Sequence, residues 1–278
     1  MSLVINTNVA SLNAQRHLHA SRSDLETAME RLSSGKRINS AMEDAAGLTI
    51  ANSLDTKVKS LQTAARNAND AISLIHLGEG ALEAVSGMLV RMRELATQAL
   101  NGTYSATDRD NLDAEFQQLI SEITRISDNT YFNGINVIGS TSTLSFQIGY
   151  DSDDSISLTL QDMASTAIGN VNTSEYLDDQ DVDTVANAGD ALDSVDAALS
   201  NVDSYRVAMG AVANRLNHTV ENLYSRIEQQ TAAKSRIQDA DYAVESANLA
   251  RAQVLQQAGT AMLAQANAST MNVLSLLK

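Results

Sequence analysis

The side chains that could carry chemistry are few in this chain, and their spacing does not bring them together. Of the four histidines, His17 and His19 are two residues apart, which places them on different faces of a helix rather than around one metal ion. There is no cysteine, so neither a thiolate nucleophile nor a disulfide is available. The HExxH, GxSxG and GxGxxG motifs are absent. None of these observations supports a catalytic centre.

Two short stretches partly match loops that bind phosphate or Ca²⁺. Gly35 and Lys36 look like the end of a P-loop, but Arg37 follows where Ser or Thr is required. Residues 151–154 (Asp-Ser-Asp-Asp) match the first half of a Ca²⁺ loop, without its central Gly or its closing Glu. A solvated turn is the favoured interpretation of these four residues. We therefore expect no enzyme activity, no cofactor and no metal site.

Composition favours long helices. The chain contains no proline, and an interior proline would remove a helix hydrogen bond and clash with the preceding turn. Aromatic residues make up only 4% of the sequence, and alanine is frequent. We therefore expect helices packed on helices rather than a large sheet.

The acidic residues are concentrated in the middle of the chain. The formal net charge is −15, and residues 139–205 hold thirteen acids with no Lys or Arg. The rest of the chain is nearly neutral. Without a basic stripe to displace counterions, nucleic-acid binding has no support, and we expect the acidic segment to face solvent.

Apolar spacing predicts where the central helices lie. Along 58–100, a stripe that includes Glu79, Ser86 and Arg93 steps by alternating threes and fours, as in a long coiled-coil helix. Gly102, after Asn101, provides a left-handed cap. A second helix is predicted from about residue 107, and the spacing returns from about residue 195.

The remaining segments complete the predicted fold. Alternating apolar and polar residues over 144–160 predict a β-hairpin, and the Ser/Thr/Asn/Asp-rich 161–186 predicts a loop. The N-terminal arm is predicted to end its helix at 33–35 (Ser-Ser-Gly). The predicted class is mainly α: a long antiparallel coiled-coil rod with both termini together, plus a small β-hairpin.

Both ends of the chain lack charge. No charged side chain precedes Arg16, and none lies between Arg251 and Lys278. A signal peptide is not predicted, because a basic region and an unbroken apolar run are missing; polar residues also exclude a membrane span at the C-terminus. Pairing the two ends would leave an association surface exposed, made of Leu249, Leu255, Met262, Leu263, Leu276 and Leu277.

Several longer stretches resemble bacterial flagellin. They are VINTNVASLNAQ near the start, ERLSSGKRINSAMEDAAGLTIA (30–51), RNANDAISLIHLGEGAL (66–82), SRIQDADYAVESANLARAQVLQQAGTAMLAQAN (235–267) and the closing NVLSLLK. The resemblance covers roughly 1–138 and 186–278, with small departures such as Met42 and Glu43. It implies a structural subunit that polymerises into the flagellar filament used for swimming motility.

The resemblance also implies a division of the chain by role. The terminal arms would form the innermost layers of the filament and be disordered in the free monomer. The expected segments are an N-terminal inner arm with a spoke turn (1–42), the N-terminal part of the rod (43–138), a hairpin and acidic surface loop in place of outer domains (139–185), the C-terminal rod helix (186–238) and a C-terminal inner arm (239–278).

Three sets of residues are predicted to carry function. Inner-core assembly residues are expected at Ile5, Val9, Leu12, Leu25, Leu32, Val244, Val254, Ala258, Ala261, Leu274 and Leu277. Residues lining an export channel are expected at Gln253, Gln256, Thr260, Asn267 and Thr270. By resemblance to the flagellin segment that Toll-like receptor 5 recognises, outward-facing receptor contacts are expected at Arg91, Leu95 and Glu115.

The resemblance implies partners and a location as well. They are further copies of the chain, hook-junction and filament-cap proteins, and an export chaperone on the C-terminal arm, with secretion by the flagellar export system to the extracellular filament. Two alternatives stay open at this point. One is a hook–filament junction protein of the same family, and the other is a secreted binding module or adhesin that displays the acidic loop.

Overall fold

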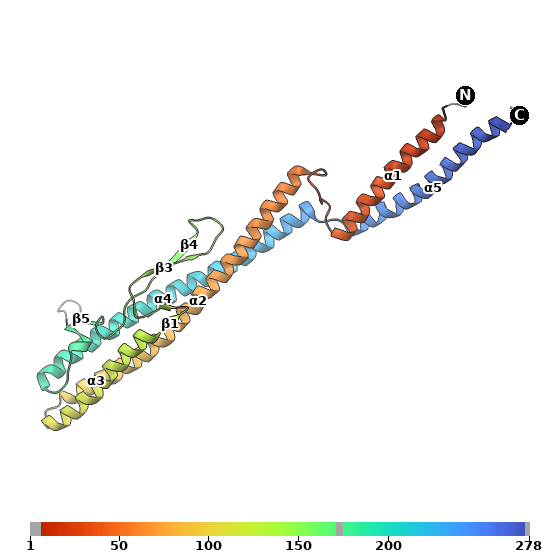
Figure 1. Cartoon of the computed structure of the whole chain (residues 1–278). Coiled ribbons are helices and arrows are strands. Elements are labelled where there is room, and N and C mark those ends of the chain that lie inside the picture. The colour runs from red at the N-terminus through yellow and green to blue at the C-terminus, as the bar shows by residue number, and fades with distance from the viewer. Residues whose placement is uncertain (1–6, 171–174, 276–278) are drawn as a thin grey trace. The chain divides into compact units, whose positions relative to one another are not determined.

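The computed structural model describes residues 7–170 and 175–275, with side chains for 7–169 and 176–269. The chain forms two compact units: a terminal unit (Met1–Val58 with Glu228–Lys278) and a central unit (Lys59–Ile227). The predicted mainly α class with a small β-hairpin is confirmed. In chain order the helices are α1 (Val9–Ser34), α2 (Ala45–Ala99), α3 (Ala106–Asn129), α4 (Val185–Gln238) and α5 (Tyr242–Ser275) (Figure 1).

In the terminal unit, α1 and α5 pack against each other in antiparallel directions. At the start of α1, Asn8 accepts a hydrogen bond from the Ser11 amide at 3.1 Å, and its Nδ2 donates to the Ala266 carbonyl at 2.9 Å. At its end, Gly35 has φ 69° and its amide donates to the Arg31 carbonyl at 2.9 Å. The predicted helix end at 33–35 is confirmed. Glycine is favoured at position 35 because the cap has a left-handed conformation.

The seam between α1 and α5 consists mainly of small and polar side chains. On α5 the buried and half-buried positions repeat every three or four residues, and so do those on α1. Gly259 marks a close approach, because a Cβ there would lie 3.2 Å from Leu18 Cδ1. The seam positions are Ser11, Ala14, Leu18, Ser21, Leu25, Ala28 and Leu32 on α1 and Glu245, Leu249, Ala252, Gln256, Gly259, Leu263 and Ala266 on α5.

Two connections of the terminal unit are fastened to each other by main-chain bonds. The segment after α1 and the short turn between α4 and α5 form an isolated antiparallel bridge at Lys36 and Asp239. The Arg37 amide donates to the Gln238 carbonyl at 2.6 Å, and the Ala240 amide donates to the Gly35 carbonyl at 3.0 Å. These bonds hold the two helix junctions side by side within this unit.

In the central unit, α2, α3 and α4 share one hydrophobic core. The α2 helix ends before Asn101-Gly102 as predicted, but the left-handed cap predicted at Gly102 is wrong, because neither of these residues has a positive φ. The α3 helix starts one residue before the predicted position, at a capping box in which the side chains of Ser105 and Asp108 bond each other's amides. The α4 helix starts ten residues before the predicted Val195. Its first buried positions are alanines, which carry little periodic signal.

The buried face of α2 is wider than the predicted stripe. Leu61, Leu82 and Leu89 are buried as expected. Arg93, predicted on the seam, is instead half exposed and pairs with Asp196 of α4 at 2.6 Å. A second buried row runs beside the first, because α2 contributes to a core shared with two other helices. This row comprises Ala71, Leu74, Val85, Met92, Leu95 and Ala99.

The strands form three small antiparallel pairs. The predicted hairpin over 144–160 is confirmed, and its inner residues Ile156 and Leu158 are buried in the core. The first pair closes through a turn with positive φ at both Asn133 and Gly134 (48° and 81°). The pairs are β1 (Tyr131–Phe132) with β2 (Ile135–Asn136), β3 (Thr143–Gln147) with β4 (Ser155–Thr159), and β5 (Gly169–Asn170) with β6 (Glu175–Tyr176).

The predicted loop after the hairpin is mostly irregular, with a short 3-10 helix at Leu177–Asp179. One side of it carries apolar residues into the core, among them Met163 and Ile168. Its charged side stays open: no described acidic side chain in 139–205 is buried. In the subunit these side chains are therefore exposed or half-buried, and their exposure on the filament stays a prediction.

Candidate functional site

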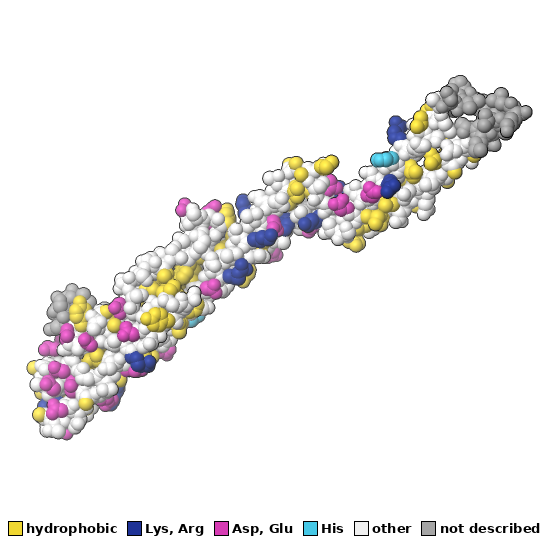
Figure 2. All heavy atoms as spheres, viewed as in Figure 1, with side chains coloured by type: hydrophobic (Ala, Val, Ile, Leu, Met, Phe, Trp, Pro, Cys, Tyr) yellow, Lys and Arg dark blue, Asp and Glu magenta, His cyan; other side chains and the backbone are white. Residues whose placement is uncertain are grey.

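The terminal unit leaves a row of apolar side chains open on both of its helices. Val254 is 64% exposed and Met262 63%, although a side chain that belonged to a closed core would be buried. In Figure 2, hydrophobic side chains lie open along this helix pair. We call these residues the assembly surface: Val9, Leu12 and Met29 of α1, and Val244, Val254, Leu255 and Met262 of α5.

The predicted inner-core residues fall into three groups. Leu25 and Leu32 are half-buried in the α1–α5 seam. Ile5 and Leu277 lie outside the described residues, as does the side chain of Leu274. The others are exposed in the subunit: Val9, Leu12, Val244, Val254, Ala258 and Ala261.

The composition of the exposed surface differs in part from the prediction. Leu255 and Met262 are exposed as expected. Leu249 and Leu263 were predicted to be exposed, and this is wrong, because both lie half-buried on the face of α5 that contacts α1. In an Ala-rich helix with apolar residues on every side, the contact face is set by the partner helix rather than by the sequence pattern.

Only some of the predicted channel-lining residues lie on an exposed face of α5. Gln253, Thr260 and Asn267 are exposed and seven residues apart, so they share one face of α5. Gln256 is half-buried on the seam with α1, so its assignment to that open face is wrong within the subunit. The side chain of Thr270 lies outside the described residues.

A charged cluster ties α1 to α5 at the junction end of the terminal unit. Arg31 donates from Nη1 to Glu245 at 3.2 Å and from Nη2 to Glu43 at 3.1 Å. Burial alone would lower the pKa of Arg31, but its hydrogen bonds to Glu245 and Glu43 raise it. The Asn39 amide, followed by Arg31, lowers the pKa of Glu43. Both shifts favour the charged forms of Arg31 and Glu43.

A second charged group lies on the central unit. Arg91 of α2 bonds Glu115 of α3 with two nitrogens, at 2.8 and 3.3 Å, and Glu94 with the third, at 3.0 Å. These bonds raise the pKa of Arg91, and the Arg91 bond lowers that of Glu115. Both side chains are nearly half exposed. Leu95, predicted to face outward beside them, is 0% exposed, so that orientation is wrong.

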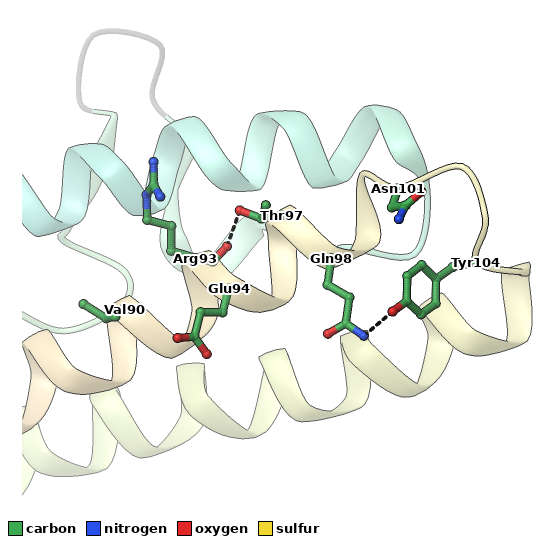
Figure 3. A pocket seen from close by; sticks show the side chains of 7 residues that line it. All are labelled: Val90, Arg93, Glu94, Thr97, Gln98, Asn101 and Tyr104. Carbon is green, nitrogen blue, oxygen red and sulfur yellow. Dashed lines mark hydrogen bonds between the residues drawn. The ribbon is translucent and has the colours of Figure 1, made fainter.

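A pocket of about 540 Å³ opens beside this group, at the end of α2. Figure 3 shows Gln98 reaching the hydroxyl of Tyr104, to which its Nε2 donates at 2.7 Å. Arg93 and Glu94 point to opposite sides, toward α4 and α3 (Figure 3). The pocket is lined by both polar and apolar side chains. Gln98 and Tyr104 bond each other, whereas Arg93 and Glu94 pair with Asp196 and Arg91, which do not line it.

Metal and membrane sites have no support in the described part of the chain. There, no three His, Cys, Asp or Glu side chains gather closely enough to hold a metal ion. The same residues include no helix long and apolar enough to cross a membrane. Open apolar faces on a helix pair are typical of a protein that assembles with others.

Comparison with known proteins identifies the family. The bacterial flagellin N-terminal helical region matches residues 5–143, and the C-terminal helical region matches 192–277. A flagellin from Halalkalibacterium halodurans is 42% identical over 277 residues, with 99% of this chain and 100% of that protein covered. The flagellin of Bacillus subtilis is 40% identical over 302 residues, with 99% of each covered. The chain belongs to the bacterial flagellin family.

A solved structure agrees with this assignment. The crystal structure of Bacillus cereus flagellin is similar with a TM-score of 0.50 and 33% identity, over 57% of this chain and 88% of that one. As a flagellin, the protein is a structural subunit that polymerises into the extracellular bacterial flagellar filament, which serves swimming motility. The family and the filament function expected from the sequence are confirmed.

Proposed function

We propose that α1 and α5 form the inner layers of the filament and bury the assembly surface against the same helices of neighbouring copies. The observation that carries this proposal is the exposure of large apolar side chains on two helices that carry no charged side chain before Arg16 or between Arg251 and Lys278. Each Val, Leu or Met removed from water contributes roughly 1.5–3 kcal/mol. Several such side chains per copy, repeated along a polymer, give a substantial driving force for assembly.

The division of the chain by role remains part of this proposal. The inner arms are proposed to be 1–42 and 239–278, the rod 43–138 with 186–238, and the surface segment 139–185. The compact units divide elsewhere, after Val58 and after Ile227. Parts of the rod helices next to the arms therefore belong to the terminal unit.

Removal of residues 252–278 tests the proposal. We expect the truncated chain to lose elongation of filament seeds completely, because about half of the assembly surface lies on this segment. The central core does not include these residues, so its thermal unfolding should be unchanged. Electron microscopy and circular dichroism measure the two effects. Filaments of normal length from the truncated chain would refute the proposed role.

The shared face of Gln253, Thr260 and Asn267 is proposed to line the export channel. Uncharged polar side chains hold neither charged nor apolar segments of a passing chain firmly. A density map of the filament tests this directly. If the map placed this face against a neighbouring copy, the proposed channel-lining role would be wrong.

Export and assembly partners follow from the same family membership. We propose secretion through the flagellar export system, a chaperone on the C-terminal arm, and contact with hook-junction and cap proteins at the filament ends. We further propose that the chain has no enzyme activity, in keeping with structural relatives. The curated relatives are named flagellins, so neither a junction protein nor a separate adhesin is favoured.

Recognition by Toll-like receptor 5 is proposed for Arg91 and Glu115 on the monomer. Both side chains are open to solvent and already present a paired guanidinium and carboxylate. Leu95 can take part only if α2 and α3 separate locally. Replacement of both charged residues by alanine should weaken receptor activation by monomer. An unchanged response from a folded double variant would rule the assignment out.

A further inference from the structure

We propose that Arg31 is a positioning residue that locks α1, the loop after it and α5 into the arrangement that assembles. The proposal rests on the assembly role proposed above for the two terminal helices. Arg31 lies in the last turn of α1. Its two terminal nitrogens bond Glu245 in the first turn of α5 and Glu43 in the loop. A single guanidinium thus joins three segments of the terminal unit.

Both carboxylates are fixed at their second oxygen as well. Glu245 accepts from Asn248 Nδ2 at 3.3 Å, and Glu43 accepts from the Asn39 amide at 2.8 Å. Glu245 is only 7% exposed, and a buried carboxylate is costly unless a cation and hydrogen bonds compensate it. Arg31 supplies that cation, so its loss would leave Glu245 without a positive partner in the cluster.

The rest of the α1–α5 seam is poorly suited to holding the two helices in one arrangement. Its buried members on α1 are Ser11, Ser21 and Ala28, which are small and present little shape for a partner to recognise. Small residues at heptad spacing permit close approach, but they oppose sliding or separation only weakly. Near the start of α1, Asn8 donates to the Ala266 carbonyl. At the junction end, the Arg31 cluster adds a directional contact between charged side chains of α1 and α5.

The main-chain bonds of the junction lie at the same end. The Ala240 amide donates to the Gly35 carbonyl four residues after Arg31, and the Arg37 amide donates to the Gln238 carbonyl. Arg37 also donates from Nη2 to the Ile237 carbonyl at 2.7 Å. These bonds fix α1 and α5 at the junction end. From there the two helices can pack against each other progressively as a subunit joins the filament.

Seeded polymerisation of full-length Arg31→Gln tests the proposal. The measurement is the lowest monomer concentration that elongates filament fragments. We expect this concentration to rise about tenfold or more, since a hydrogen bond between charged groups contributes about 1.5–3 kcal/mol. The matched control is Arg22→Gln on the same helix. Arg22 pairs with Glu26 at 3.0 Å, and both side chains are highly exposed, so its loss should change the concentration less than about twofold.

A second variant separates charge from packing. In Arg31→Gln with Glu245→Gln, no buried charge is left unpaired, so elongation should recover most of the loss seen in Arg31→Gln. If Arg31 acted only through the packing of its stem, the double variant would elongate no better than the single one. Circular dichroism and thermal unfolding of each monomer establish that the central unit is folded.

The outcomes separate the two proposals. Equal elongation by the natural chain, Arg31→Gln and Arg22→Gln would overturn the role of Arg31 and leave the assembly proposal intact. A double variant no better than Arg31→Gln would also overturn the positioning role. Failure of the natural chain to elongate seeds at all would instead contradict the proposed function itself.

Discussion

The central and terminal units are both built from antiparallel helices, but they bury very different side chains. In the central unit, Leu82, Leu89, Phe116 and Ile123 are fully buried in a core shared by three helices. In the terminal unit, the buried positions of α1 are two serines and an alanine, while larger apolar residues stand in solvent. The central unit holds a core of large apolar side chains within one copy, although it also exposes Val207 and Tyr224. The α1–α5 pair buries no comparable core and leaves Val254 and Met262 exposed.

The difference is large enough to decide how each unit folds. Ordering one residue costs about 1–2 kcal/mol in backbone entropy, and burying one large apolar side chain returns roughly 1.5–3 kcal/mol. A seam whose buried positions on α1 are Ser and Ala, and whose leucines are only half-buried, returns less than a core of fully buried Leu, Ile and Phe. We therefore expect the terminal helices to depend on neighbouring copies for their order, as proposed for the free monomer.

Matched truncations of one side chain in each unit give the largest contrast. Leu82→Ala should lower the free energy of unfolding of the central unit by about 2–5 kcal/mol, because it leaves a cavity in a filled core. Val254→Ala should change monomer stability by less than about 0.5 kcal/mol, yet raise the concentration needed for elongation. Chemical denaturation and seeded polymerisation measure the two quantities. Similar loss of monomer stability in both variants would erase the distinction between the units.

Two glycines of α2 test how closely the central core is packed. A Cβ on Gly78 would lie 2.9 Å from both Met209 Cε and Val137 Cγ1, whereas a Cβ on Gly80 meets nothing within 4 Å. Gly78→Ala should therefore destabilise the central unit by about 1–3 kcal/mol. Gly80→Ala should stabilise it by about 0.4–1 kcal/mol, because the unfolded chain loses conformational freedom. A thermal shift of the same sign in both variants would contradict this packing.

Mild acid should affect the terminal unit through Glu43. Its pKa is lowered in the folded state by the Asn39 amide and by Arg31, so the unfolded state binds protons more readily. The stability that Glu43 contributes is complete above the ordinary glutamate pKa and is lost as pH falls through the lowered value. We expect filaments of Glu43→Gln to dissociate less steeply as the pH falls. This effect should be smaller than the effects of the core substitutions. Turbidity against pH measures it, with Glu26→Gln as the exposed control. Identical profiles for the natural chain and Glu43→Gln would refute the contribution.

Local signals made much of the helical layout predictable. Gly35 marked a helix end because a left-handed cap strongly favours glycine. Asn101-Gly102 also marked a helix end within a residue or two, although neither residue adopts a left-handed conformation. The alternation in 144–160 predicted the main hairpin. The β1–β2 pair was missed because two-residue strands leave no periodic pattern, although Asn133-Gly134 is a typical signal for a tight turn.

Long-range choices could not be predicted from spacing. Along α5 the apolar residues are not confined to one stripe, so Leu249 and Leu263 were assigned to the exposed surface although they lie half-buried on the face that contacts α1. On α2, Leu95 was assigned to the outside because a single stripe was expected where two partner helices require a wider one. The bond between Arg31 and Glu245 joins residues 214 apart in sequence, and no local pattern predicts which charges will meet at that distance.

The uninterrupted lengths of α2 and α4, at 55 and 54 residues, have a kinetic consequence. The chain contains no proline, so none of its peptide bonds requires the prolyl isomerisation that delays folding by tens of seconds. Long helices also form from contacts that are close in sequence, which favours fast folding. A subunit secreted through the proposed export route could therefore regain its helices promptly on reaching the filament.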